Sequence, residues 1–247
     1  MKPLAVDLCC GLGGWTDGLL AEGWDVLGFD IERHIYGNEK YPAQLVLQDI
    51  LTLDGRQFRG KVFLITASPP CQKYSYMAMP WTRAKTLVRW YEDADHPERR
   101  AELNALFNAC IRIGKEAECP TIIENVRGAQ KWVGRSRWNF GSFHLWGDVP
   151  ALMPIDSATK VGGFDYGTAG YKAQAFNGTA EKRVREGDKV GGSWWNERDN
   201  RYPPILMMSS KSPARARARA SAMIAKIPLP LARHIGRIYS PPSSPKP

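Results

Sequence analysis

Short apolar segments alternate with segments of helical period over the first half of the chain. The first apolar run, residues 3–10, is closed by the turn Gly11-Leu12-Gly13-Gly14, a pattern typical of a buried strand that turns sharply into a helix. Further strands are predicted at residues 24–31, 45–50, 62–67, 121–126 and 139–146, and helices at residues 15–22 and 98–118. Strands that alternate with helices predict an α/β fold whose mostly parallel sheet is covered on both faces.

The pattern changes after residue 147. Residues 156–212 are rich in glycine, basic and aromatic residues with little periodicity, which predicts a small irregular module at residues 148–212. An Arg/Ala alternation then leads into an apolar stretch at residues 224–238, where flanking alanines favour a helix. We therefore predict a main domain of residues 1–147 plus 213–240, the appended module, and a disordered Pro/Ser-rich tail at residues 241–247.

Length and composition narrow the class of protein. A chain of 247 residues with 43% hydrophobic and 24% charged residues suits one globular domain with a smaller appendage. No segment approaches the roughly 20 apolar residues of a membrane span, and no secretory signal is evident, so we expect a cytoplasmic protein. Five cysteines without a CxxC pair and four scattered histidines predict reduced thiols and no metal site.

The charge is unevenly distributed along the chain. Residues 1–70 hold six Lys/Arg and nine Asp/Glu, and the remaining residues hold 28 and 16, so the two parts have net charges of −3 and +12. The basic part predicts contact with a polyanion, although a soluble surface with surplus arginine is an equal alternative.

Three features at strand ends suggest a nucleotide-like ligand. The Gly-rich turn at residues 11–14 brings backbone N–H groups close to a ligand. Asp30 ends the second strand, where a carboxylate can accept hydrogen bonds from both ribose hydroxyls, and Asp49 ends the third, where it could bind an adenine amino group. Taken singly, each acid is better explained as a helix cap or part of a solvated turn.

Cys71 lies in the segment SPPCQ (residues 68–72), directly after an apolar strand. The two prolines fix the backbone and present the thiol at the carboxyl edge of the sheet, where open α/β sheets bind ligands. A thiolate suits attack on a soft, electron-poor ring carbon. A buried structural cysteine is the alternative, which the position after the turn disfavours. Glu124 ends the next strand and should face the same crevice, although a lone glutamate there is more often structural.

Together these elements resemble the cytosine carbon-5 DNA methyltransferase family, in a small, phage-like form. The resemblance rests on DLCCGLGGWTDGL, GFDI, QDI, SPPCQ and IIENV, in the family's order across residues 4–126. It implies a Rossmann-like S-adenosylmethionine-dependent methyltransferase sheet with a target-recognition module. The implied activity is DNA (cytosine-5)-methylation, in restriction-modification or phage self-protection, within a bacterial or phage-infected host cell.

The resemblance also implies a mechanism and its residues. Cys71 attacks C6 of a cytosine flipped out of the duplex and Glu124 binds N3 and the exocyclic amine, so that C5 takes the methyl group of S-adenosylmethionine. Asp30 would hold the cofactor ribose, Asp49 its adenine, and the 11–14 turn its amino-acid end. The implied cofactor contacts are Asp7, Cys9, Gly11, Gly13, Gly14, Trp15, Asp30, Ile31, Asp49, Ile50, Pro69 and Lys226.

The sequence departs from the family pattern at three places. The motif QxRxR is represented by Arg135 and Arg137 without the glutamine. Arg137 is the implied contact to cytosine O2 and Arg135 its support, with phosphate contacts as the alternative. Cys9 replaces a phenylalanine beside the cofactor. Lys226 replaces an asparagine near the sulfonium, where unit charges a few Å apart repel by about 4 kcal/mol at an effective dielectric constant near 20.

Lys226 has two explanations. In the first, its long side chain extends to phosphate or solvent. In the second, it neutralises a carboxylate on the transferred group, so that the cofactor is carboxy-S-adenosylmethionine and the product 5-carboxymethylcytosine. The sequence leaves both explanations open.

The expected partner is double-stranded DNA, bound by a monomer that needs neither metal nor membrane. Residues 148–212 occupy the family's position for target recognition and interleave basic with aromatic residues. The predicted DNA contacts are Gln72, Lys73, Arg198, Arg201, Arg215, Arg217 and Arg219. Two other functions stay open: a tRNA cytosine methyltransferase on the same fold, and a catalytically inactive DNA-binding regulator, which intact Cys71 and Glu124 disfavour.

Overall fold

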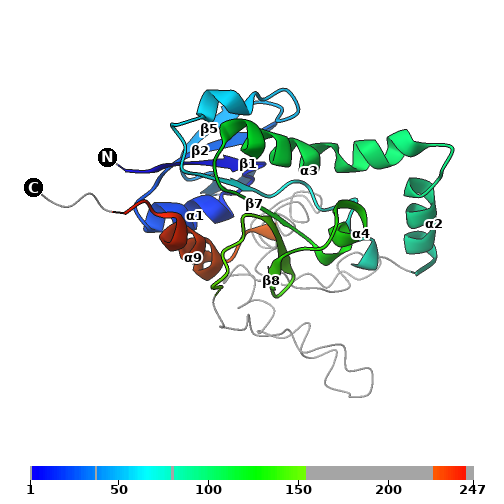
Figure 1. Ribbon diagram of the computed structural model, residues 1–247. Coiled ribbons are helices and arrows are strands. Elements are labelled where there is room, and N and C mark those ends of the chain that lie inside the picture. Colours follow the sequence, from blue (N-terminus) through cyan, green and yellow to red (C-terminus); the bar gives the residue numbers. More distant parts are fainter. Residues whose placement is uncertain (1, 37, 79–80, 154–224, 243–247) are drawn as a thin grey trace, which may run out of the picture.

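A seven-stranded sheet forms the centre of the computed structural model, which describes residues 2–36, 38–78, 81–153 and 225–242 (Figure 1). Its strand order is β5-β2-β1-β6-β7-β9-β8. The first five strands are parallel, and β9 and β8 complete the sheet as an antiparallel pair. The strands are β1 (Leu4–Leu8), β2 (Asp25–Asp30), β5 (Gln44–Leu47), β6 (Leu64–Ala67), β7 (Thr121–Asn125), β8 (Trp138–Phe140) and β9 (Phe143–Gly147).

Helices cover both faces of the sheet. Helices α1 (Gly14–Ala21) and α9 (Leu229–Tyr239) pack side by side on one face, and α3 (Pro97–Ala117) lies on the other (Figure 1). Alternation along β1 follows this division, because Ala5 belongs to the core under α1 and α9, whereas Val6 and Leu8 belong to the core under α3. The shorter elements are β3 (Ile35–Tyr36), β4 (Glu39–Lys40), η1 (Gly55–Phe58), η2 (Ser75–Ala78), α2 (Trp81–Tyr91), η3 (Arg127–Ala129) and α4 (Gln130–Val133).

Polar contacts as well as apolar packing tie α9 to the start of the chain. The Trp24 indole N–H donates to the Gly236 carbonyl at 3.0 Å. Glu22, at the end of α1, accepts from Arg233 at 2.5 Å and from Arg237 at 2.9 Å. These contacts bring residues 225–227, which precede α9, to the carboxyl edge of the sheet beside the Gly-rich turn.

The predicted fold class is confirmed: the protein is a mixed α/β structure with a mostly parallel central sheet. Three boundaries differ from the prediction. The third predicted strand ends at Leu47, so Asp49 lies in the following loop. The predicted strand at residues 139–146 is two strands, β8 and β9, which turn at Gly141 with a left-handed φ of 59°. Helix α9 begins only at Leu229, with Pro228 as its N-cap and Pro230 in its first turn, because proline lacks the N–H group that a helix interior needs and is tolerated at the helix start.

Two elements have no counterpart in the sequence prediction: α2 and the short β3–β4 hairpin. Ala84 and Tyr91 of α2 are buried, and Leu87 and Val88 pack against the core, so the apolar stripe has the i, i+3, i+4, i+7 spacing of an amphipathic helix, which the sequence prediction missed. The proposed module at residues 148–212 lies almost wholly outside the described residues, and the domain division remains a prediction. No helix in the described ranges is long and apolar enough to cross a bilayer.

Candidate active site

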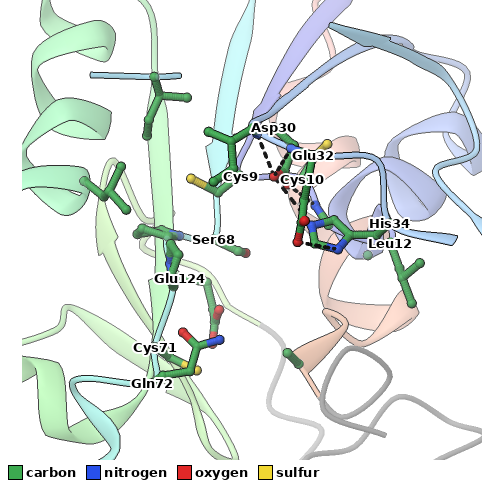
Figure 2. Close-up of a pocket in the computed structure, with 18 of the residues that line it drawn as sticks. Cys9, Cys10, Leu12, Asp30, Glu32, His34, Ser68, Cys71, Gln72 and Glu124 are labelled. Carbon is green, nitrogen blue, oxygen red and sulfur yellow. Dashed lines mark hydrogen bonds and ion pairs between the residues drawn. The ribbon is translucent and has the colours of Figure 1, made fainter. Parts of the chain in front are cut away.

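The carboxyl ends of the parallel strands open into one cavity of about 700 Å³ (Figure 2). This size is typical of small-molecule sites. The loops after β1, β2, β5 and β6 contribute to its walls together with Glu124 of β7, and the segment before α9 closes one side. The lining includes Cys9, Gly11, Gly14, Trp15, Asp30, Ile31, Asp49, Ile50, Pro69, Cys71, Gln72, Lys73, Glu124 and Lys226 from the predicted site.

Asp30 organises one end of the cavity. Its carboxylate accepts backbone N–H bonds from Gly11 at 2.9 Å and from Ile31 at 2.8 Å, and the His34 ring nitrogen Nε2 lies 3.5 Å away. Burial works against ionisation, but the hydrogen bonds from His34 and Gly11 outweigh it and lower the pKa of Asp30. The hydrogen bond to Asp30 correspondingly raises the pKa of His34. The carboxylate is therefore a charged acceptor, held in place by the main chain.

Cys71 and Glu124 lie on the other side of the cavity, across from Asp30 and His34 (Figure 2). The turn that carries Cys71 is fixed by two hydrogen bonds. The Asn125 amide donates to the Pro69 carbonyl at 2.9 Å, and the Ser75 hydroxyl donates to the Cys71 carbonyl at 2.9 Å. Glu124 is the penultimate residue of β7, and only 4% of its surface is exposed. A thiol and a buried carboxyl group thus share a wall, which suits nucleophilic attack on a ring that the acid holds.

A sequence model of the C-5 cytosine-specific DNA methylase family matches residues 4–135, just over half of the chain. The chain belongs to this family. The match confirms the resemblance drawn from the sequence motifs, and it spans the predicted cofactor turn, Cys71 and Glu124.

Two solved structures are similar to this chain. One is described as a DNA modification methyltransferase encoded within an E. coli prophage, with 22% identity over 54% of this chain and 35% of that chain, and a TM-score of 0.37. The chain thus spans about a third of the length of the prophage protein. The other is S. pombe Dnmt2 methyltransferase, with 12% identity over 96% of this chain and 98% of that chain, and a TM-score of 0.46. A search of curated proteins gave no significant match.

Two predicted cofactor contacts, Asp7 and Gly13, do not line the cavity. Asp7 is buried beneath the Gly-rich turn, where it accepts hydrogen bonds from the hydroxyls of Thr16 at 2.7 Å and Thr66 at 3.2 Å. Burial raises the pKa of Asp7 to about 7. Gly13 precedes α1 with a left-handed φ of 76°, so it shapes the turn without facing the cavity. Both residues therefore support the Gly-rich turn without lining the cavity.

Cys9 and Cys10, which follow β1, differ from Cys71 in their surroundings. Cys9 lines the cavity, but its thiol is hydrogen-bonded to Cys110 of α3, and this contact together with burial raises the pKa of Cys9. Burial also raises the pKa of Cys10. A protonated thiol is a poor nucleophile, so neither residue competes with Cys71 for that role.

The predicted arginine pair lies away from the cavity. Arg135 and Arg137 are exposed and are not among the lining residues. Between them, the Ser136 hydroxyl hydrogen-bonds the His144 ring nitrogen Nδ1 at 2.9 Å and the Gln130 amide oxygen at 3.2 Å. A base contact by Arg137 therefore stays a prediction, as does the phosphate alternative.

Lys226 lines the cavity, and its ammonium group lies 2.6 Å from the Asp17 carboxylate on α1. Neither explanation drawn from the sequence includes this ion pair. Gly14 permits the arrangement, because a Cβ atom there would lie 2.3 Å from the backbone nitrogen of Ile227. The segment before α9 can thus approach the Gly-rich turn closely.

The predicted DNA contacts divide into two groups. Gln72 and Lys73 are exposed at the cavity, and Lys73 pairs with Glu102 at 3.3 Å. The other predicted contacts lie outside the described residues: Arg198, Arg201, Arg215, Arg217 and Arg219.

Sequence reasoning missed several lining residues, among them the polar side chains of Glu32, His34, Tyr36 and Ser68. The rings of His34 and Tyr36 stack with centroids 6.3 Å apart, and the Trp15 indole N–H donates to the Ser68 hydroxyl at 3.1 Å. His34 lies four residues after Asp30, the one local signal that could have found it. The others follow from the β3–β4 hairpin and from the packing of α1 on β6.

The cavity fits S-adenosylmethionine as judged by its donor set. Asp30 offers an ionised carboxylate for the ribose, and Asp49, whose carboxylate accepts the Leu51 N–H at 2.9 Å, also lines the cavity. The Gly-rich turn and the N-terminus of α1 line another part of the cavity. In the described ranges, no group of His, Cys, Asp and Glu side chains is arranged to hold a metal ion.

Proposed function

We propose that the chain is an S-adenosylmethionine-dependent DNA (cytosine-5)-methyltransferase that works through a covalent Cys71 adduct. The observation that carries the proposal is the placement of Cys71 and Glu124 across one cavity from the Asp30 cradle. The family match supports cytosine as the substrate base and DNA as its carrier.

The proposed chemistry assigns separate tasks to the two sides of the cavity. The Cys71 thiolate bonds to C6 of an extruded cytosine, and the C5–C6 π electrons become available at C5. Glu124 holds N3 and the exocyclic amine, which favours electron flow into the ring. When bound, S-adenosylmethionine supplies a methyl group on a positively charged sulfur. After C5 has taken that group, loss of the C5 proton restores the C5–C6 double bond as Cys71 leaves.

The Asp17–Lys226 ion pair bears on the choice between methyl and carboxymethyl transfer. A lysine paired with a carboxylate at 2.6 Å already has a neutralising partner, so it needs no carboxylate on the transferred group. The pair also offsets the repulsion that a lone ammonium group would exert on the sulfonium. Methyl transfer is therefore the proposed reaction.

The test uses a mechanism-based trap. Duplex DNA that contains 5-fluorocytosine at many sites is incubated with the protein and S-adenosylmethionine, and protein–DNA adducts are separated under denaturing conditions. Fluorine cannot leave as the C5 proton does, so wild type should remain bound through sulfur, whereas Cys71→Ala should form no adduct. Cys119→Ala serves as the matched control, because Cys119 lies outside the cavity lining.

Nucleoside mass spectrometry of DNA and tRNA from cells that express the protein separates the remaining functions. We expect 5-methylcytosine in DNA, absent with Cys71→Ala. A carboxymethyl product, or modification of tRNA alone, would replace the proposal by one of its rivals. Binding of both cofactor and DNA without any adduct or product would identify an inactive regulator.

A further inference from the structure

Helix α2 exposes two tryptophans on the surface of the described chain. Trp81 has 73% and Trp90 has 52% of its surface accessible, and Met77, in the preceding loop, has 58%. Singly scattered exposed hydrophobic residues are common, whereas exposed apolar residues grouped with polar ones mark interaction surfaces. In Figure 1, α2 stands across the far end of α3, away from the sheet.

Side-chain contacts fix the position of α2 although its outer face is exposed. The rings of Tyr91, at its end, and Tyr76, in the loop before it, contact Trp132 edge to face at 5.8 and 6.4 Å. The Tyr74 hydroxyl contacts the Leu103 carbonyl and the Asn104 amide oxygen, each at 3.0 Å. The chain that leads from Cys71 to α2 is thus anchored on α3 and α4, which holds the outer face of α2 at a set position relative to the catalytic turn.

The two tryptophans differ in what covers them. The Arg99 guanidinium lies 3.5 Å from the centre of the Trp90 ring and also pairs with Asp93 at 2.8 Å, so this cluster is internally satisfied. The Lys85 ammonium lies 4.6 Å from the centre of the Trp81 ring. Within the described ranges, Lys85 forms no ion pair.

Trp81, Lys85 and Arg89 form one stripe along α2, because residues four apart lie on the same face of a helix. The helix holds three cations and no acid in the sequence WTRAKTLVRWY. The rise between Lys85 and Arg89 is about 6 Å, close to the roughly 7 Å spanned by two nucleotides of one DNA strand. The charge and spacing of the stripe therefore complement a regularly spaced polyanion. They suit an apolar protein surface, or one that mixes acidic and apolar residues, less well.

We propose that the Trp81–Lys85–Arg89 stripe binds the phosphate backbone of duplex DNA beside the target cytosine. This inference rests on the proposed function and adds a second DNA contact to it, on the helix that follows the catalytic turn. Lys85 and Arg89 contact phosphates, and the Trp81 ring holds the Lys85 ammonium over its face and packs against the sugar edge of the strand.

The test is the salt dependence of duplex binding. A fluorescein-labelled duplex of 24 base pairs with mixed sequence is titrated with the double variant Lys85→Gln/Arg89→Gln between about 50 and 300 mM salt. Each phosphate contact that the variant removes should reduce the slope of log affinity against log salt by about 0.9, so the expected reduction is about 2. The matched control is Lys61→Gln/Lys115→Gln, which removes two exposed charges outside the cavity lining.

Trp81→Ala and Trp90→Ala form a second comparison. The first should weaken duplex binding at least fivefold and the second less than twofold, because only Trp81 belongs to the stripe. Binding of S-adenosylhomocysteine should be unchanged in every α2 variant, which shows that the fold and the cofactor site persist.

Three outcomes would overturn the inference. The α2 double variant could keep the wild-type slope, the control pair could lower the slope equally, or tRNA binding could fall while duplex binding does not. If wild type binds S-adenosylhomocysteine but no duplex at all, the proposed function itself fails, and the result is distinguishable from failure of the stripe alone.

Discussion

The two ends of the cavity are built in different ways. At the cofactor end, two backbone N–H groups hold Asp30 at 2.8 and 2.9 Å, and buried side chains support the turn from below. At the catalytic end, Gln72 and Lys73 are exposed and the chain continues into a helix whose tryptophans face solvent. Under the proposed function, the described residues preorganise the cofactor end, whereas the exposed side chains of the catalytic end are available to contact nucleic acid.

Glu124→Gln should separate the two ends with the largest effect. The substitution keeps the size of this buried side chain but removes the carboxylate that holds the cytosine ring, so methyl transfer should fall by about 10² to 10⁴-fold. Affinity for S-adenosylhomocysteine, measured by calorimetry, should stay within twofold. Glu102→Gln, an exposed acid at the cavity, is the control. Turnover within threefold of wild type would refute the assigned role.

Asp7→Asn tests whether the buried support of the cofactor end depends on pH. Burial raises the pKa of Asp7 to about 7, so the folded protein keeps a proton that the unfolded chain loses near pH 4. Stability from this group is complete below about pH 4 and declines until pH 7, by roughly 4 kcal/mol in all. The amide of the variant has no proton to lose, so its thermal unfolding temperature should decline less between pH 5 and pH 8. Parallel curves for the two proteins would show that Asp7 is ionised throughout.

Asp30→Asn should weaken the cofactor end alone. An amide offers the ribose hydroxyls a neutral acceptor and places an NH₂ group near the N–H donors of Gly11 and Ile31. A hydrogen bond to a charged group contributes about 1.5–3 kcal/mol, so affinity for S-adenosylhomocysteine should fall about 10- to 100-fold. Asp25→Asn, at the exposed start of the same strand, should change it little. Equal losses in the two variants would mean that Asp30 only stabilises the strand.

Much of the difference between the two ends of the cavity could be predicted from local sequence. The cradle of Asp30 and the Gly-rich turn lies where apolar runs end in β1 and β2, and the SPPCQ turn follows the buried strand β6 in the same way. Parallel strands bring their carboxyl ends to one edge, so local patterns sufficed to gather Asp30, Cys71 and Glu124 at one cavity.

Contacts between distant segments could not be predicted in this way. The Asp17–Lys226 pair joins residues more than 200 positions apart, and no period or turn signal encodes it. Helix α2 was missed although Ala84, Leu87, Val88 and Tyr91 have helical spacing, because the exposed Trp81 and Trp90 blur the contrast between its apolar and polar sides. Arg135 and Arg137 are the opposite case. A family motif identified them in the sequence, but they do not line the cavity.

Asp17→Asn tests the role of residues 225–227, the segment before α9, and has the smallest expected effect. The substitution leaves the Lys226 ammonium at the cavity without its carboxylate partner at 2.6 Å. S-Adenosylmethionine carries a positive sulfur and S-adenosylhomocysteine does not, so the loss should be selective for the former. Both side chains of the pair are partly exposed, at 20% and 35%, and solvent screening limits the expected loss to roughly threefold.

The double variant Asp17→Asn/Lys226→Met supplies the control, because it removes the ammonium group as well. The ratio of the two dissociation constants should return to the wild-type value, although both constants can shift together through packing of the segment before α9. A selective loss that persists in the double variant would place the effect on α1 rather than on Lys226. If Asp17→Asn weakened the binding of both ligands equally, the ion pair would only hold the segment before α9 in place. It would then have no electrostatic effect on the sulfonium.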